Sequence, residues 1–135
     1  MSRGYGGAAR IALQDENTVV YEYAAYNLNV EGLRNSDHIY DGVITINKAS
    51  LVEPEIHEKT KRMPSGRKKL IVKRIARDVD YRNLFDTGMI TVENSSFCWR
   101  ILDNGVGMVA MKIIFKLFRL YQEEGTLPDR VGYDV

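Results

Sequence analysis

The stretch VGMVAMKIIFKLFRLYQEE, residues 106–124, carries the pattern that decides the fold. Its polar side chains lie on one narrow stripe, with spacings of i, i+4, i+7 and i+11: Lys112, Lys116, Arg119 and Glu123. Almost every other position is apolar, which predicts a helix that is covered over most of its circumference. Gly125 and Pro128 follow and predict the end of this helix. Asp103 or Asn104 is expected to cap its start.

A buried helix needs elements that cover it, and most of the preceding chain has the character of strands. The predicted strands are residues 9–13, 18–26, 39–47, 69–75, 89–93 and 97–102. Turn-forming clusters such as Asp15-Glu16-Asn17 and Asn94-Ser95-Ser96 separate them. We therefore expect an α+β fold, in which an antiparallel sheet of about six strands packs on one face of the long C-terminal helix.

A second, shorter helix is expected near residues 51–62. Ser50 and Glu53 have the spacing of a capping box, and Pro54 suits a first helical turn. The helix should end before Pro64, because the residue that precedes a proline avoids the α region. Since the sheet can cover only one side of the C-terminal helix, either this second helix or a second protomer is expected to cover its flanks.

The composition is that of an ordinary globular protein. At 135 residues, with 44% hydrophobic and 27% charged side chains, the chain is expected to form one domain over residues 9–135, after a flexible Gly-rich start at residues 1–8. Cys98 is the only cysteine, which excludes an intrachain disulfide and a Cys-based zinc site within one chain. The sequence has neither the pattern of a secretory signal nor an apolar run that spans a bilayer, so we expect a cytoplasmic protein without membrane contact.

The charge is distributed unevenly. The segment KTKRMPSGRKKLIVKRIAR, residues 59–77, holds nine of the nineteen Lys and Arg residues and no Asp or Glu. The rest of the chain keeps ten basic against eighteen acidic residues, so a total of +1 combines a +9 segment with a −8 remainder. A local field attracts anions whatever the total charge. The predicted anion-binding residues surround a turn at Pro64-Ser65-Gly66: Lys59, Arg62, Arg67, Lys68, Lys69, Lys73 and Arg74.

Three interpretations of this basic segment remain open. It could bind a polyanion, either nucleic acid or a phosphate-bearing ligand, because Arg holds oxyanions in bidentate fashion and a glycine turn frees backbone amides. It could instead protect a strand edge or neutralise acidic groups of the same domain. It could also contact an acidic protein. No helix-turn-helix, zinc finger or RNP pattern accompanies it. Tyr21, Tyr23 and Tyr26 could stack on bases if exposed, but alternating tyrosines are more often half-buried core.

Catalytic patterns are weak. The two histidines are His38 and His57, and the carboxylates around His57 are explained by a solvated helix face. Asp41, Glu93 and Lys48 could be assembled into a two-metal nuclease, but the sequence does not place them together. The chain has no Walker loop, dinucleotide fingerprint or nucleophile elbow. We therefore expect no catalytic residue, no metal and no cofactor.

The first functional hypothesis is a small non-enzymatic domain that binds a polyanion, nucleic acid above all, through residues 59–77. The alternative is a protein-interaction or homo-oligomerisation module that uses the apolar C-terminal helix. Its interface candidates are Met108, Met111, Phe115 and Phe118. A hydrolase or nuclease is the third hypothesis.

Overall fold

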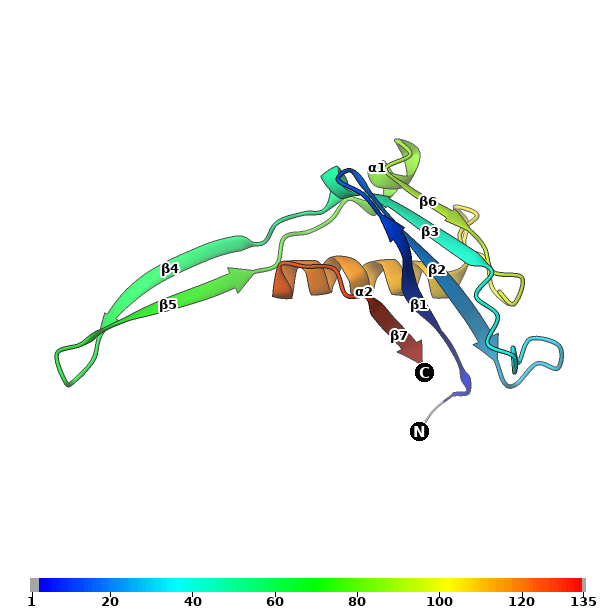
Figure 1. Ribbon diagram of the computed structural model, residues 1–135, viewed down its shortest axis with the longest axis horizontal. Coiled ribbons are helices and arrows are strands. Elements are labelled where there is room, and N and C mark those ends of the chain that lie inside the picture. The colour runs from blue at the N-terminus through cyan, green and yellow to red at the C-terminus, as the bar shows by residue number, and fades with distance from the viewer. Residues whose placement is uncertain (1–2, 135) are drawn as a thin grey trace.

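The computed structural model describes residues 3–134 and shows an α+β protein with seven strands in two antiparallel sheets (Figure 1). In chain order the elements are β1 (Tyr5–Gln14), β2 (Thr18–Asn27), β3 (Gly42–Asn47), the 3-10 turn η1 (Lys48–Ser50), β4 (Glu55–Arg62), β5 (Lys68–Ile75), α1 (Tyr81–Asp86), β6 (Ile90–Glu93), α2 (Met108–Glu124) and β7 (Arg130–Asp134). The main sheet has the order β6-β3-β2-β1-β7, and β4 pairs with β5 alone. The predicted class is confirmed, whereas the single sheet of about six strands is wrong.

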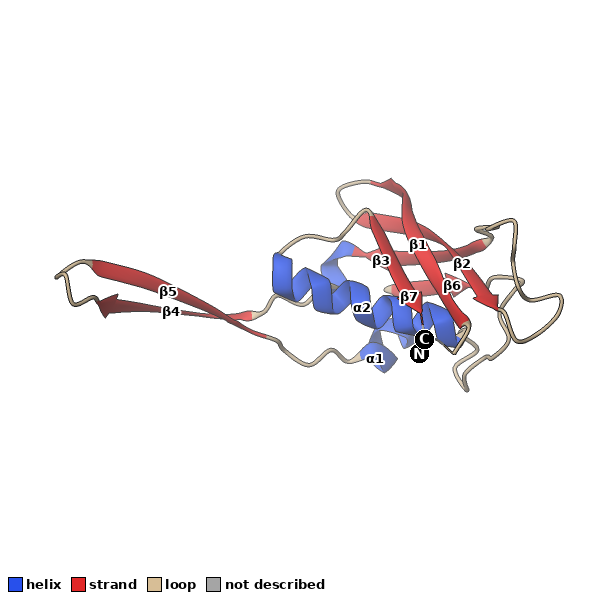
Figure 2. Ribbon diagram, turned by 90° about the horizontal axis from the view of Figure 1, so that it is seen from below, coloured by secondary structure: helices blue, strands red, loops and turns tan. Residues whose placement is uncertain are grey.

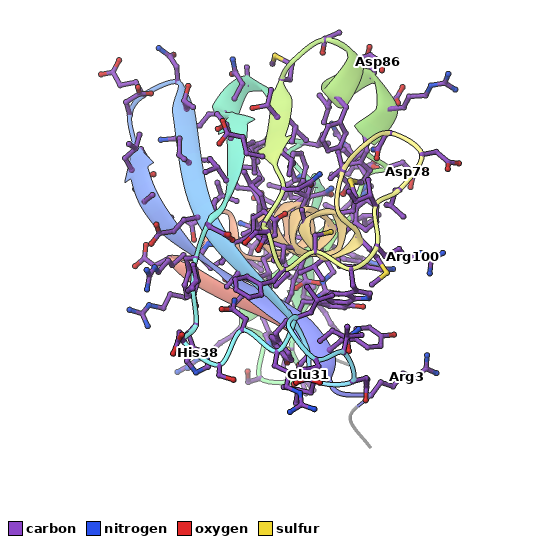
Figure 3. All side chains as sticks on the ribbon, turned by 90° about the vertical axis from the view of Figure 1, so that its right-hand side faces the viewer. Arg3, Glu31, His38, Asp78, Asp86 and Arg100 are labelled. Carbon is purple, nitrogen blue, oxygen red and sulfur yellow. The ribbon has the colours of Figure 1, made fainter. Side chains whose placement is uncertain are left out.

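The core lies between α2 and one face of the main sheet (Figure 2). Because side chains alternate along a strand, one face of each central strand turns toward the helix. The largest fully buried side chains are Tyr21, Tyr23, Phe118, Ile44, Ile46, Ile90, Ile113, Ile114 and Leu117. Burying each such apolar side chain contributes about 1.5–3 kcal/mol. Figure 3 views the molecule with α2 nearly end-on and shows side chains filling the space inside the curved sheet.

Two glycines allow the close packing of this core. A Cβ atom on Gly7 of β1 would lie 2.5 Å from Cγ1 of Val109 on α2, so only glycine lets the strand approach the helix here. A Cβ atom on Gly42 would lie 2.2 Å from Cε1 of the Tyr23 ring. The tyrosine is held in this place at its other end, because its hydroxyl accepts a hydrogen bond from the Ser95 amide at 2.9 Å. Burial raises the pKa of Tyr23 to about 12, so the phenol stays neutral at physiological pH.

Segments of the same chain cover the flanks of α2. Partly buried side chains from the region of α1 and from the loop after β6 pack against the core to which α2 belongs: Val79, Tyr81, Leu84, Phe85, Phe97, Trp99 and Leu102. The Tyr81 ring meets Phe115 and Phe118 edge-on, with centroid distances of 4.7 and 5.5 Å. This chain therefore covers part of the flank of α2 itself, without a helix at 51–62.

The expected end of α2 is confirmed and its expected start is not. The helix ends at Glu124, and Gly125 adopts a left-handed conformation with φ of 80°. At the start the N-cap is Gly107, without a side-chain cap, so neither Asp103 nor Asn104 caps the helix. The side chain of Asn94 instead accepts a hydrogen bond from the Gly107 amide at 2.7 Å, which ties the helix start to the loop after β6.

The helix predicted near residues 51–62 is wrong, because residues 55–62 form strand β4. The capping signals act elsewhere: Ser50 ends the turn η1, and Glu53 accepts a hydrogen bond from the hydroxyl of Tyr121. The following segment, with Leu, Ile and Val in succession, is a strand that needs a partner, and residues 55–62 provide it. Long-range pairing thus overrides a local helix signal.

Three further expectations need correction. Residues 97–102 do not form a strand, and β6 pairs with β3 rather than in a hairpin with them. β7 was not expected, and it adds an edge strand beside β1. The Gly-rich start was expected to be flexible over residues 1–8, of which residues 1 and 2 lie outside the described residues. Residues 5–8 belong to β1 and pair with β2, and residues 6–8 pair with β7 as well.

Candidate functional site

The basic segment forms a hairpin that extends away from the rest of the molecule (Figures 1 and 2). We call residues 55–75, which comprise β4, its turn and β5, the arm. The strands pair from Glu55 opposite Ile75 to Arg62 opposite Lys68. At about 3.3 Å per residue, eight paired residues give a ribbon roughly 26 Å long. Every residue of the arm is exposed, and within residues 3–134 the core includes none of them.

The tip of the arm is the turn predicted at Pro64-Ser65-Gly66. The Gly66 amide donates to the Met63 carbonyl at 2.9 Å, and the Met63 amide donates to the Arg67 carbonyl at 2.7 Å. Gly66 has φ of +85°, a conformation in which a residue with a Cβ is strained. Pro64 occupies the second position of the turn, where its fixed φ is favourable. The turn is therefore encoded locally.

Both faces of the arm carry bases. Residues directly opposite each other in an antiparallel pair share a face. One face, which we call the lysine face, holds Lys59, Lys61, Lys69 and Lys73. The other face holds Arg62, Lys68 and Arg74. Arg67 lies in the turn between them.

Two like-charged pairs lie directly opposite each other near the tip. Lys61 is paired with Lys69, and Arg62 is paired with Lys68. Such pairs destabilise a hairpin, since the side chains start only about 4.5–5.5 Å apart at Cβ. Within residues 3–134 no carboxylate forms an ion pair with any of these four bases. No ion pair in the described part of the chain therefore offsets the electrostatic repulsion between these side chains.

The base of the arm is fixed to the last turns of α2. The side chain of Gln122, only 5% exposed, accepts from the Arg77 amide at 2.6 Å and donates to the Arg77 carbonyl at 2.9 Å. The Arg74 guanidinium donates to the Gln122 carbonyl at 3.3 Å, close to the negative end of the helix dipole. Just before β4, Glu53 accepts a hydrogen bond from the hydroxyl of Tyr121. Both ends of the arm are therefore held by one end of α2.

The structure brings all seven predicted anion-binding residues onto the arm. Six of them are free to meet a ligand, whereas Arg74 contacts the end of α2. Sequence analysis did not include Lys61, which on the helix expected at 51–62 would lie on a different face from Lys59 and Arg62. Reading the same residues as a strand pairs it with Lys69.

The four interface candidates on α2 do not form one exposed surface. Met111 is 6% exposed and Phe118 is 1% exposed, and both belong to the core of this chain. Met108 is half-buried, and Phe115 is 39% exposed. The tyrosines do not form a stacking platform either, since Tyr21 and Tyr23 are buried beneath α2.

The residues of the other chemical hypotheses are not brought together. Glu93 lies opposite Val43, near the end of β3 that Asp41 precedes, but Lys48 follows the other end of this strand, roughly 20 Å from Asp41 along an extended chain. His57 lies on the arm with its Nε2 atom 2.7 Å from Glu55 Oε1 rather than beside Glu53, and His38 lies at the periphery (Figure 3). Between residues 3 and 134, no group of three or more His, Cys, Asp or Glu side chains could hold a metal ion.

Asp41 has a structural role that pH should reveal. It accepts hydrogen bonds from the Ser95 hydroxyl at 2.7 Å and from the Ser96 amide at 3.2 Å. Burial alone would raise the pKa of Asp41, but the bonds from Ser96 and Ser95 outweigh it and lower the pKa. The ionised form therefore stabilises the fold at neutral pH, and this stability is lost as the pH falls through the folded-state pKa.

We expect Asp41→Asn to be less stable than the wild type at pH 7, with a difference that shrinks below about pH 4. Urea unfolding at several pH values measures this directly. Asp37→Asn is the control, because Asp37 lies exposed in the preceding loop. A difference between Asp41→Asn and wild type that stays constant with pH would contradict the role assigned to this carboxylate.

Comparison with protein-family models, with curated proteins and with solved structures found no match. Within residues 3–134 no helix combines the length and the apolar content that crossing a bilayer requires.

Proposed function

We propose that this chain binds nucleic acid through the arm. The observation that carries the proposal is the pair of opposed like charges, Lys61 with Lys69 and Arg62 with Lys68. Local rules of stability are broken chiefly at functional sites, and here a polyanion would remove the repulsion. The regularly spaced phosphates of a nucleic acid match the arm, which carries Lys and Arg side chains along most of its length.

Neutralisation of acidic groups within the domain and protection of a strand edge, the two structural interpretations of the basic segment, explain the arm less well. Neutralisation within the domain requires nearby carboxylates, and none of the described ion pairs joins a Lys or Arg of the arm to a carboxylate. Protection of a sheet edge concerns β6 and β7, which are the edges of the main sheet. It gives no reason for a chain to build an exposed hairpin in the first place.

The salt dependence of binding tests the proposal. If about six bases of the arm contact phosphates, the logarithm of the affinity for a 30-bp duplex should fall with the logarithm of salt concentration with a slope of about −5. Fluorescence anisotropy with labelled DNA measures this slope. Absence of binding at about 100 µM protein and 50 mM salt would rule the proposal out, because even non-specific binders are detected in this range.

A second candidate function is docking on an acidic protein, and exposed aliphatic side chains of the arm favour it. Ile56, Leu70 and Val72 share one face and are 53%, 58% and 52% exposed. A protein partner would bury them, and the −8 remainder of the chain makes a second copy one such partner. A dimer that dissociates at high salt in analytical ultracentrifugation would support this function. A monomer at every salt concentration would remove the second copy as the partner.

A further inference from the structure

We infer that the arm enters a groove of duplex DNA and that its Met63-Pro64 tip inserts between base pairs and bends the duplex. The inference rests on the proposed function and names the ligand class and the way it is held. Three features of the arm support this inference: the distribution of Lys and Arg side chains over both faces, the absence of aromatic side chains, and the chemistry of the tip.

The distribution of Lys and Arg side chains on the arm favours binding in a groove over binding on the outer surface of the duplex. A ribbon that lies on the outside of a nucleic acid needs cations on one face only. A ribbon inside a groove has a phosphate backbone on each side. The arm presents four lysines on the lysine face and Arg62 and Lys68 on the other, so both backbones are within reach of cations.

The absence of aromatic side chains favours a duplex over a single strand. Proteins that bind single strands combine a basic groove with aromatic rings on which successive bases stack. Residues 55–77 contain no Phe, Tyr or Trp. Tyr21 and Tyr23, which could have supplied such rings, are buried under α2. Stacked and paired bases need no such platform, because the duplex itself keeps them stacked.

The tip has the chemistry of an intercalating wedge. Met63 is 37% exposed at the end of the ribbon, and Pro64 follows it at the corner of the turn. Apolar side chains, Met and Pro among them, are inserted between base pairs from the minor groove by proteins that bend DNA by 20–90°. Five basic side chains lie within a few residues of Met63 and Pro64: Lys61, Arg62, Arg67, Lys68 and Lys69. They would hold the backbone on either side while the tip reaches the base pairs.

The test uses a 30-bp duplex with a donor and an acceptor dye at its two ends, and one of its strands alone. The wild-type chain should bind the duplex at least ~10-fold more tightly than the single strand and should raise energy transfer between the ends. Met63→Ala with Pro64→Ala should remove most of the rise in transfer and keep the salt slope. The turn should survive this change, because Gly66 remains and the hydrogen bonds of the turn join backbone atoms of Met63, Gly66 and Arg67.

The matched control is Leu70→Ala with Val72→Ala, which removes apolar atoms from the arm away from its tip. It should bend the duplex as the wild type does. Equal or tighter binding of the single strand, or bending that the tip variant leaves unchanged, would overturn this inference and leave the proposed function standing. No binding to either probe would overturn both.

Discussion

Reversing the charge of Lys68 and Lys69 is expected to lower the affinity for duplex DNA by roughly 100-fold or more at 0.15 M salt. Each reversal removes a phosphate contact and adds a repulsive one. The same change converts two like-charged cross-strand pairs into opposite-charged pairs with Arg62 and Lys61. The hairpin should therefore become more stable while binding is lost. Fluorescence anisotropy measures the affinity, and amide hydrogen exchange in the arm measures its stability.

The opposite direction of the two effects makes this experiment decisive. A loss of binding caused by unfolding would be accompanied by faster exchange in the arm, not slower. The control is Arg82→Glu with Lys112→Glu, which changes the net charge equally at exposed positions of α1 and α2. Its affinity should fall only a few-fold. If both double variants bind equally weakly, the net charge rather than the arm governs binding.

Truncation of Phe118 to Ala is expected to reduce the free energy of unfolding by about 3–5 kcal/mol. The ring is 1% exposed, and its loss leaves a cavity between α2 and the sheet and removes an edge-on contact with Tyr81. Chemical denaturation with fluorescence detection measures the change. Since Phe118 was an interface candidate, sedimentation of the same variant shows whether the residue also mediates association.

Phe115→Ala is the matched control on the same helix. Phe115 also meets Tyr81 edge-on, but it is 39% exposed, so its truncation should cost about 1 kcal/mol. Equal destabilisation by the two truncations would contradict the burial described for α2. A change of oligomeric state without loss of stability in Phe118→Ala would revive the interface hypothesis.

The sequence predicted those parts of the fold that depend on local signals. The narrow polar stripe of residues 106–124 predicted the buried helix, and Gly125 marked its end. The short helix α1 depends on equally local chemistry, because the carboxylate of its N-cap residue Asp80 accepts a hydrogen bond from the Asn83 amide at 3.1 Å. The turn at Pro64-Ser65-Gly66 was likewise predicted from proline and glycine chemistry. In each case the decisive interaction lies within a few residues.

Features that depend on distant partners were not predictable. Residues 55–62 carry helix-start signals before them, yet pairing with β5 makes them a strand. β7 is short and polar, and it is a strand because β1 lies beside it. For the candidate site, the sequence located the bases around one turn, but not that they extend on a ribbon outside the core. That arrangement follows from the pairing of β4 with β5 and from the two hydrogen bonds between the Gln122 side chain and the Arg77 backbone.

The attachment of the arm at a single place separates what the chain touches from what keeps it folded. Because none of the arm's side chains contributes to the core described here, its reach can change in evolution while the remainder of the domain stays intact. Two residues added to each strand would preserve the alternation of faces and move the tip about 7 Å outward. Insertion of a single residue in each strand would exchange the two faces beyond that point. The length of the arm and the direction in which its two faces point can therefore change while the rest of the domain stays the same.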